Sequence, residues 1–308
     1  MTAELVTFVH ASVALATPIA LAATGETISE SAGVLNLGLE GTMLVGAFAA
    51  VLGVMATGSP AAGLAVAVAS GAAFAGLLAL LVLAFRADQV IAGTALNLAA
   101  AGLTAVVWRA VQLRSEFGAT GGEMRRAAFS EIDVPFLSDI PVVGPALFHH
   151  HPIALLTIAA IPLAWIFLFR SAAGLRLRAV GESPEAAAAF GISVARTRLA
   201  AILASGAFGG AAGACLSIAD ASTFIEGMSS GRGFVAIALV IFGGYRPLGA
   251  GAAALLFGAA LALQYRLQAS GSGLPPELFR SLPYALSLVV LAGFAGRRRA
   301  PAALGRRT

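Results

Sequence analysis

Lysine is absent from this sequence, because all 19 basic residues are arginine. A Walker A phosphate-binding loop needs a lysine to contact the nucleotide phosphates, and Schiff-base catalysis needs a lysine amine. The chain therefore carries neither a nucleotide site of this type nor this form of covalent catalysis. If ATP drives the protein, another chain binds it.

Cysteine is nearly absent as well. The one cysteine, Cys215, excludes a disulfide within the chain, and its apolar neighbours favour a role as a small apolar filler. The N-terminal segment MTAELVTFVH lacks the basic region of a cleavable signal peptide. We therefore expect the first apolar run to be retained as a membrane span.

Charge is scarce throughout the chain. Only 11% of the 308 residues are charged, 59% are hydrophobic, and the mean hydropathy is +0.91. No soluble fold buries this much apolar surface, so the sequence predicts an all-α integral membrane protein that forms one domain over residues 1–308. The net charge of +4 does not indicate nucleic-acid binding, because the arginines cluster in loops between apolar runs. We expect no cofactor.

Nine apolar runs are long enough to cross a bilayer, which takes about 20 residues, or somewhat fewer where the bilayer is thinned. They lie near residues 5–24, 42–57, 62–85, 90–111, 152–170, 197–219, 224–243, 248–268 and 279–296.

The arginines predict the orientation of these spans. Residues 171–198 contain four arginines and the tail after residue 296 contains five. By the positive-inside rule both segments are cytoplasmic. Counting back along the spans places the N-terminus and the long loop 112–151 outside.

A glycine-punctuated break carries three carboxylates. Glu26, Glu30 and Glu40 lie in GETISESAGVLNLGLEG, inside a stretch of 85 residues without lysine or arginine. Intramembrane ionisable residues are costly and are tolerated mainly where they face a bundle interior or a water-filled path. We therefore predict that a transport pathway passes near residues 25–41.

A second break, near residues 224–235, resembles the first. It contains GMSSGRG, and discontinuous helices at corresponding positions of two halves indicate the binding region of a transporter. The alternative is that glycine is simply common in membrane helices. Two Gly-x-x-x-Gly spacings between Gly206 and Gly213 favour close helix packing within the chain over a subunit interface.

The segment GESPEAAAAFGIS predicts a short helix with well-defined ends. Ser183 is a good N-cap, Pro184 suits the first helical position, Glu185 complements the helix dipole, and Gly191 follows Phe190 as a terminator. So short a helix is marginal alone, and its alanine-rich face anchors poorly in a membrane. We therefore favour docking into a partner's groove over a linker on lipid headgroups.

Four segments carry a family resemblance. They are ATPIALAATGETISESAGVLNLGLEGTMLVGA, FRADQVIAGTALNLAAAGLT, GLRLRAVGESPEAAAAFGISVARTR and GMSSGRGFVAIALVIFGGYRPLG. They resemble the permease subunits of ATP-binding-cassette importers, in the branch shared by ribose-type sugar, branched-chain amino acid and nucleoside uptake systems. The sequence from Glu26 to Gly41 is most similar to that of nucleoside permeases that receive their substrate from basic-membrane-protein lipoproteins.

The resemblance implies a bacterial inner-membrane permease that imports nucleosides, with ribose-type sugars or branched-chain amino acids as alternatives. It implies three partners: a second, different permease, a cytoplasmic ATPase and an extracytoplasmic substrate-binding lipoprotein. The segment from Glu182 to Gly191 matches the family's coupling segment, so the ATPase becomes the expected partner of the short helix. Family members often have arginine where this chain has Ser31, which removes an ion partner from Glu30.

A nucleoside is neutral and rich in hydrogen-bonding groups, so its path needs amide and hydroxyl partners more than charges. Asn36, Thr94 and Asn97 are candidates, and an interhelical hydrogen bond is an equal alternative for Asn97. An ion-coupled secondary transporter would also use buried acids and broken helices, but it needs no coupling helix. An intramembrane enzyme is disfavoured. The consecutive residues His149 to His151 cannot share one side of a regular element as zinc ligands, and no catalytic motif is present.

Overall fold

A computed structural model describes residues 2–113, 129–133, 135, 138, 143–269, 275, 277–279, 281–285 and 300–305. Within these residues, seven helices are long and apolar enough to cross a membrane. They are α1 (Thr2–Ser31), α2 (Leu39–Thr57), α3 (Pro60–Ala79) with its π-helical extension η1 (Leu80–Ala84), α4 (Gln89–Leu113), α7 (Pro152–Arg170), α10 (Val194–Ala214) with its π-helical extension η3 (Cys215–Ala221), and α12 (Pro247–Ala269).

The remaining elements connect these seven. They are β1 (Ile132–Asp133), α6 (Val143–Leu147), β2 (His149–His150), α8 (Ala172–Glu182), α9 (Pro184–Ala189) and α11 (Arg232–Phe242). The two short strands pair antiparallel, with Ile132 opposite His150. The predicted all-α class therefore has one small exception, in the described part of the loop 112–151. The predicted loop 171–198 is itself mostly helical, since α8, α9 and the first turn of α10 occupy it.

The model supports seven of the nine predicted spans. The run at 224–243 is not a continuous span, because its first part forms turns and only α11 is helical. At 1.5 Å per residue, an 11-residue helix is about 17 Å long and cannot cross a hydrocarbon core of about 30 Å. The break predicted near 224–235 is therefore present. Most of the run at 279–296 lies outside the described residues.

The first break is shorter than predicted. The helix α1 continues through the predicted start of the break to Ser31, so Glu26 and Glu30 lie in a regular helix, and the non-helical stretch is 32–38. Gly25 does not interrupt α1. A Cβ atom there would lie 2.4 Å from the Cβ of Phe208, so glycine serves close packing against α10. Gly33, with φ of +83°, marks the actual turn.

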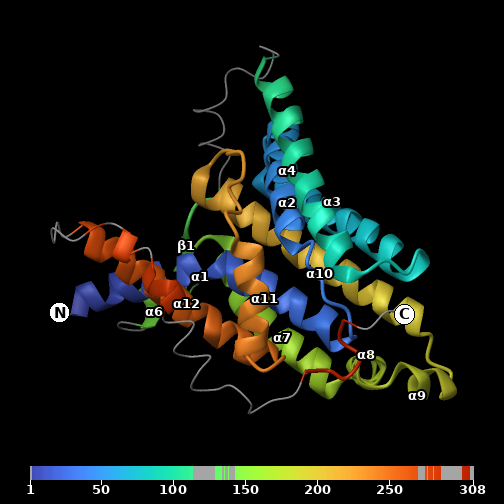
Figure 1. Cartoon of the computed structure of the whole chain (residues 1–308). Coiled ribbons are helices and arrows are strands. Elements are labelled where there is room, and N and C mark those ends of the chain that lie inside the picture. Colours follow the sequence, from blue (N-terminus) through green and yellow to red (C-terminus); the bar gives the residue numbers. More distant parts are fainter. Residues whose placement is uncertain are drawn as a thin grey trace.

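The centre of the fold is a three-helix cluster in which α2, α3 and α10 all pack against one another, while α1 packs along α12 (Figure 1). Glycine lines both sides of α10. A Cβ at Gly46 of α2 would lie 2.4 Å from the Cα of Gly210, and one at Gly71 of α3 would lie 2.4 Å from the carbonyl oxygen of Gly206. The Gly-x-x-x-Gly spacings thus serve packing within the chain, as the sequence favoured.

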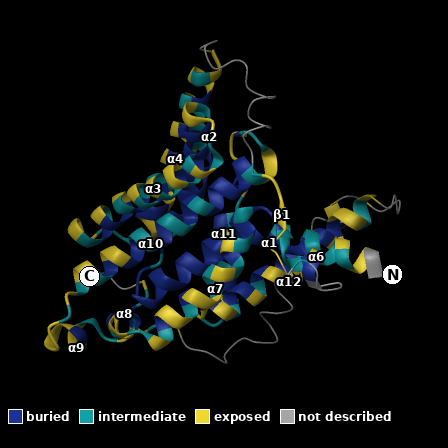
Figure 2. Ribbon diagram, turned by 180° about the vertical axis from the view of Figure 1, so that it is seen from behind, coloured by how far each residue is buried: buried dark blue, intermediate teal, exposed yellow. Residues whose placement is uncertain are grey.

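The outer faces of the long helices are apolar. Figure 2 shows buried residues concentrated between the helices and exposed residues along the outward sides of α3, α4 and α7. The exposed side chains include Leu98, Leu103 and Val106 of α4 and Leu163 of α7. Exposed leucine and valine on several neighbouring helices fit a lipid environment.

Candidate functional site

Three fully buried polar side chains hold the first break in place. The carboxylate of Glu26 on α1 accepts a hydrogen bond from the backbone N–H of Asn36 at 2.8 Å and another from the hydroxyl of Ser205 on α10 at 2.8 Å. The side-chain amide of Asn36 donates to Ser205 Oγ at 3.0 Å, which closes the network. Glu26 and Asn36 are among the pathway candidates predicted from the sequence. Ser205, which lies 169 residues beyond Asn36, was missed.

Glu30 lies one helical turn beyond Glu26 and is also fully buried. Neither of its side-chain oxygens has a hydrogen-bond partner within the described residues. A buried arginine, Arg198 of α10, donates instead to the carbonyl oxygen of Ala32 at 3.3 Å. Serine at residue 31 was expected to leave Glu30 without an arginine partner. In agreement with this, the Glu30 carboxyl group makes no hydrogen bond in the described structure.

The helix α4 braces the same break from the other side. Asn97 accepts a hydrogen bond from Gly41 N–H and donates one to the carbonyl oxygen of Leu37, each at 2.8 Å. Gln89, which sequence reasoning missed, accepts one from Leu35 N–H at 2.8 Å. Asn97 therefore makes interhelical hydrogen bonds, in agreement with the alternative considered for it. Thr94 lies on the exposed face of α4, and its hydroxyl bonds to carbonyl groups of its own helix.

Glu40, at the start of α2, joins the two breaks. Its two carboxylate oxygens accept hydrogen bonds from the backbone N–H groups of Gly231 and Gly233, each at 2.7 Å. These groups lie at the N-terminus of α11, where free N–H groups and the helix dipole favour a carboxylate. A Cβ at Gly233 would lie 2.5 Å from the Cα of Glu40, so only glycine fits there.

These contacts show how the predicted pathway residues are placed. The polar atoms of Glu26, Glu40 and Asn97 are bonded to protein groups that fix the chain at the two breaks. Asn36 retains one buried side-chain oxygen without a partner in the described structure. The arrangement thus holds two broken segments against each other, and Thr94 alone among these candidates is exposed.

The short helix α9 has the ends that the sequence predicted. The hydroxyl of Ser183 accepts a hydrogen bond from Ala186 N–H, and Gly191, with φ of +76°, donates its N–H to the carbonyl oxygen of Ala188. Phe190 follows as the C-cap and is 87% exposed. α9 thus presents an uncovered aromatic side chain at its C-terminal end and an exposed carboxylate, Glu185, in its first turn.

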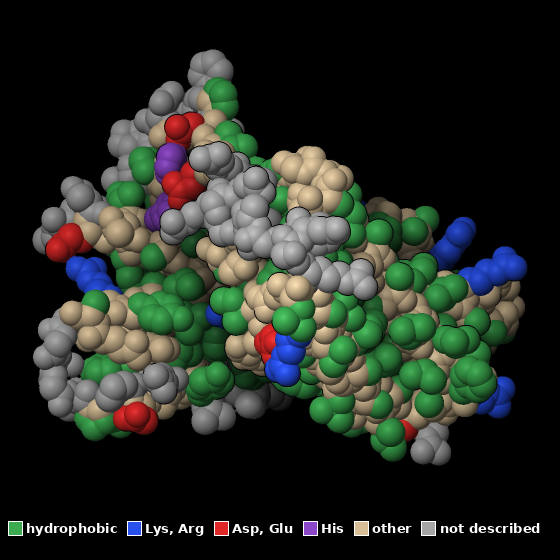
Figure 3. Space-filling model, turned by 90° about the horizontal axis from the view of Figure 1, so that it is seen from above, with side chains coloured by type: hydrophobic (Ala, Val, Ile, Leu, Met, Phe, Trp, Pro, Cys, Tyr) green, Lys and Arg blue, Asp and Glu red, His purple; other side chains and the backbone are tan. Residues whose placement is uncertain are grey.

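All four histidines of the chain lie near the N-terminal end of α1, and the exposed part of this cluster is seen beside acidic side chains in Figure 3. His10 donates to the carbonyl oxygen of His149 at 2.8 Å, and its ring stacks on His150 with centroids 4.1 Å apart. The hydrogen bond to the carboxylate of Asp133 raises the pKa of His149. Burial lowers the pKa of His150, and it lowers the pKa of His151 to about 4.

Comparison with known proteins extends these observations. The family model described as "Branched-chain amino acid transport system / permease component" matches residues 8–291. The guanosine ABC transporter permease protein NupQ of Bacillus subtilis is 37% identical over 96% of this chain and 94% of its own length. The putative glucose ABC transporter permease protein TsgC13 of Haloferax volcanii is 40% identical over 87% of this chain and 80% of its own.

Another relative is also named as a nucleoside permease. The nucleoside ABC transporter permease protein NupC of Lactococcus lactis is 36% identical over 94% of this chain and 92% of its own length. Bacillus subtilis has, besides NupQ, a second matching guanosine permease, NupP, which is 30% identical over 91% of this chain. No solved structure matches the chain. The family match covers the breaks and the α9 segment, so the chain belongs to the branched-chain amino acid transport system permease family and is a transport subunit, not an enzyme.

Proposed function

We propose that this chain is one of two different permease subunits of an ATP-driven importer of nucleosides. The observation that supports ATP coupling is the exposed Phe190 on a helix whose two ends are fixed by hydrogen bonds. A rigid helix with one large uncovered apolar side chain suits insertion into a groove of a partner. The nucleoside assignment rests on NupQ and NupC, which match almost the whole chain.

In this proposal the coupling segment runs from Glu182 to Gly191, with Ser183, Pro184 and Glu185 shaping the helix and Phe190 as the anchor. ATP binding to a separate ATPase would move this segment and, through α10, the two breaks. Each ligand must favour one state of the permease over the other for such a cycle to run. The pathway would lie beside the breaks, with Glu26, Glu30, Asn36, Glu40 and Asn97 positioning its wall. Thr94, on the exposed face of α4 that also carries Leu98, would line it only where that face meets the second permease subunit.

The partners follow from the family. NupP and NupQ of Bacillus subtilis are both named as guanosine permeases, which supports a second, different permease. An ATPase on the cytoplasmic face and an extracytoplasmic binding lipoprotein complete the system. The chain would be a single multi-pass domain of a bacterial inner membrane, with loop 112–151 and the N-terminus outside. The C-terminus and segment 171–198 would be cytoplasmic, since together they hold nine of the 19 arginines.

A ribose-type sugar or branched-chain amino acid substrate is the second candidate. TsgC13, named as a putative glucose permease, is 40% identical to this chain, and this specific observation favours a sugar. An ion-coupled secondary transporter is a candidate of another class, since Glu26 and Glu30 are buried acids in a membrane helix.

Reconstitution distinguishes these candidates. The chain is co-expressed with its neighbouring permease and ATPase genes, and the complex is placed in vesicles with the binding protein. Uptake of labelled guanosine that needs ATP, with no uptake of labelled glucose or leucine, is the expected result. ATP-dependent uptake of glucose or leucine alone would overturn the nucleoside assignment. Uptake driven by an ion gradient without ATP would overturn the importer class.

A further inference from the structure

The π-helical segment η3 brings two metal-ligand side chains onto one face. Cys215 and Asp220 are five residues apart at its two ends. In an α-helix, at 3.6 residues per turn, they would point about 140° apart. In a π-helix the backbone hydrogen bond joins residues i and i+5, so the two side chains lie nearly above each other. Such segments often mark functional sites.

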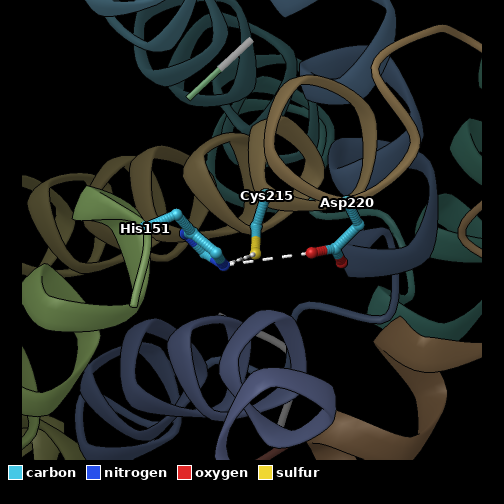
Figure 4. Close-up of side chains that lie close together, drawn as sticks. All are labelled: His151, Cys215 and Asp220. Atoms are coloured by element: carbon cyan, nitrogen blue, oxygen red, sulfur yellow. Dashed lines mark hydrogen bonds and ion pairs between the residues drawn. The ribbon is translucent and has the colours of Figure 1, made fainter. Parts of the chain in front are cut away.

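A third ligand comes from another part of the chain. His151 is the N-cap of α7, and its Nε2 atom lies 3.9 Å from Cys215 Sγ and 3.9 Å from Asp220 Oδ1. Figure 4 shows the three side chains converging on one point from α7 and η3. Their ligand atoms all lie within 4.8 Å of one another. Both contacts are long and therefore weak: one is a sulfur–nitrogen hydrogen bond and the other an ion pair without a hydrogen bond. Three ligand-type side chains thus converge without strong bonds to one another.

We propose that His151, Cys215 and Asp220 bind a zinc-class divalent transition-metal ion. Thiolate, imidazole and carboxylate are the ligands that zinc takes in proteins, and bond lengths of about 2.0–2.3 Å place ligand atoms of a tetrahedral site about 3.3–3.8 Å apart. The two 3.9 Å separations from His151 need only a small contraction, and the Cys215–Asp220 separation, which is at most 4.8 Å, needs one of up to about 1.3 Å. The Asp220 side chain is 42% exposed, so water can supply the fourth ligand from the solvent side.

No metal site is predicted from the sequence, because three consecutive histidines cannot share one side of a regular element. The structure uses one of them, His151, with Cys215 and Asp220 from residues more than 60 positions away. His151 Nδ1 also accepts a long capping hydrogen bond, 3.3 Å, from Ala154 N–H. When Nε2 binds a metal, the proton of the neutral ring is on Nδ1, which can then no longer accept this bond. The weak capping bond is therefore lost and a metal–nitrogen bond is gained.

A metal here would tie the end of the α10 and η3 helix to the start of α7. The carbonyl oxygen of Ile218 in η3 also accepts a hydrogen bond from Phe129 N–H at 3.2 Å, and Ser222 ends the segment with φ of +52°. The geometry of η3 is therefore held from several sides. This end of α10 lies opposite the end that follows the α9 segment, so the ion would fix one end of that helix.

Zinc titration of the purified full-length chain tests the proposal. We expect one tightly bound Zn²⁺ per chain, a raised unfolding temperature with Zn²⁺, and a thiolate-to-metal charge-transfer band when Co²⁺ replaces it. Cys215→Ser abolishes the band, and Asp220→Asn and His151→Asn each weaken binding by more than about 100-fold, since even outer partners of a ligand are worth about 10- to 100-fold. Asparagine is a good N-cap, so His151→Asn keeps the start of α7 intact.

The matched control is His149→Asn, which removes a neighbouring histidine paired with Asp133 and Glu131. Zinc affinity in this control should stay within about threefold of the wild type, well short of the 10- to 100-fold loss that an outer partner of a ligand produces. No Zn²⁺ binding by the wild-type chain would overturn the proposal. Unchanged zinc affinity in the folded Cys215→Ser and His151→Asn variants would also overturn it. Loss of binding in the His149→Asn control alone would overturn it too, because the ion would then be bound by His149.

Discussion

Glu40 and Gly233 touch through both backbone and side chain. The Gly233 N–H donates to Glu40 Oε2 at 2.7 Å, and the Cα atom of Glu40 occupies the space that a side chain at residue 233 would need. This contact fixes the start of α11 against the start of α2. The two breaks in the fold are therefore joined directly, and a change at either residue acts on both.

Glu40→Leu should lower the free energy of unfolding by about 3 kcal/mol or more, because two hydrogen bonds to a charged group are lost at about 1.5–3 kcal/mol each. Thermal unfolding in detergent measures the effect. The control is Glu4→Leu on the exposed start of α1. It removes only a solvent-exposed ion pair with Arg266, 3.6 Å between Glu4 Oε2 and Arg266 Nη2, and should change stability by less than about 1 kcal/mol. Equal stability of the Glu40 variant and the wild type would show that the carboxylate does not hold α11.

Ser205→Ala should destabilise the fold by about 1–3 kcal/mol, because it leaves a Glu26 oxygen and the Asn36 amide without this partner. Combined with Asn36→Leu it should cost less than the sum of the two single changes, since they break one network. A double-mutant cycle on unfolding free energies measures this coupling. Strict additivity would mean that the three side chains act independently.

Glu30→Gln should leave the unfolding temperature unchanged or raise it. Neither Glu30 oxygen has a hydrogen-bond partner in the described structure, and a buried ion without one is costlier than a neutral amide. Glu26→Gln is the matched control one turn away. It should be destabilising, because an amide cannot accept both of the hydrogen bonds that the Glu26 carboxylate receives. Destabilisation by Glu30→Gln as large as in the control would reveal an essential charge at Glu30.

Gly210→Ala should destabilise the three-helix cluster of α2, α3 and α10 by about 1–3 kcal/mol or more, as overpacking does. The new Cβ would lie 2.1 Å from the carbonyl oxygen of Ala67, which is backbone and cannot rotate away. The control is Gly102→Ala on α4, where no atom lies within 4 Å of the new Cβ. If both variants unfold at the same temperature, the contact between α10 and α3 at Gly210 can accommodate a methyl group and is looser than the structure shows.

Phe190→Asp should insert normally in the membrane but fail to retain the ATPase, because it places an unpaired carboxylate in the proposed groove. Co-purification of the ATPase and substrate-stimulated ATP hydrolysis are the two measurements. Phe85→Asp changes an equally aromatic side chain, 71% exposed, outside the α9 segment, and should retain the ATPase. Full retention by the Phe190 variant would mean that α9 is not the coupling element.

Local features of the fold could be predicted from the sequence. Apolar run lengths located seven spans, and the residue types at Ser183 and Gly191 fixed both ends of α9. Small residues at regular spacing indicated the close packing of α10. Each of these features depends on residues within a few turns of one another, so periodicity and propensity were sufficient.

The contacts across the bundle could not be predicted in this way. Ser205 meets Glu26 across 179 residues, and Glu40 meets Gly233 across 193. No local pattern specifies such pairs, because they depend on how the helices pack. The face shared by Cys215 and Asp220 depends on a π-helical turn, whereas an α-helical reading separates them. Glu26 and Glu30 were placed in the break because the glycine at residue 25 suggested an interruption that does not occur.

The glycine contacts around α10 also limit how this molecule can move. Where backbones meet at Gly46, Gly71 and Gly210, there are no long side chains to change rotamer and let one helix slide along another. We therefore expect α2, α3 and α10 to travel as one block during any change of state. The turning points then fall in the non-helical stretches that border this block, at 32–38, 85–88, 190–193 and 222–231. A spin-label pair across α3 and α10 should keep its distance when the breaks move.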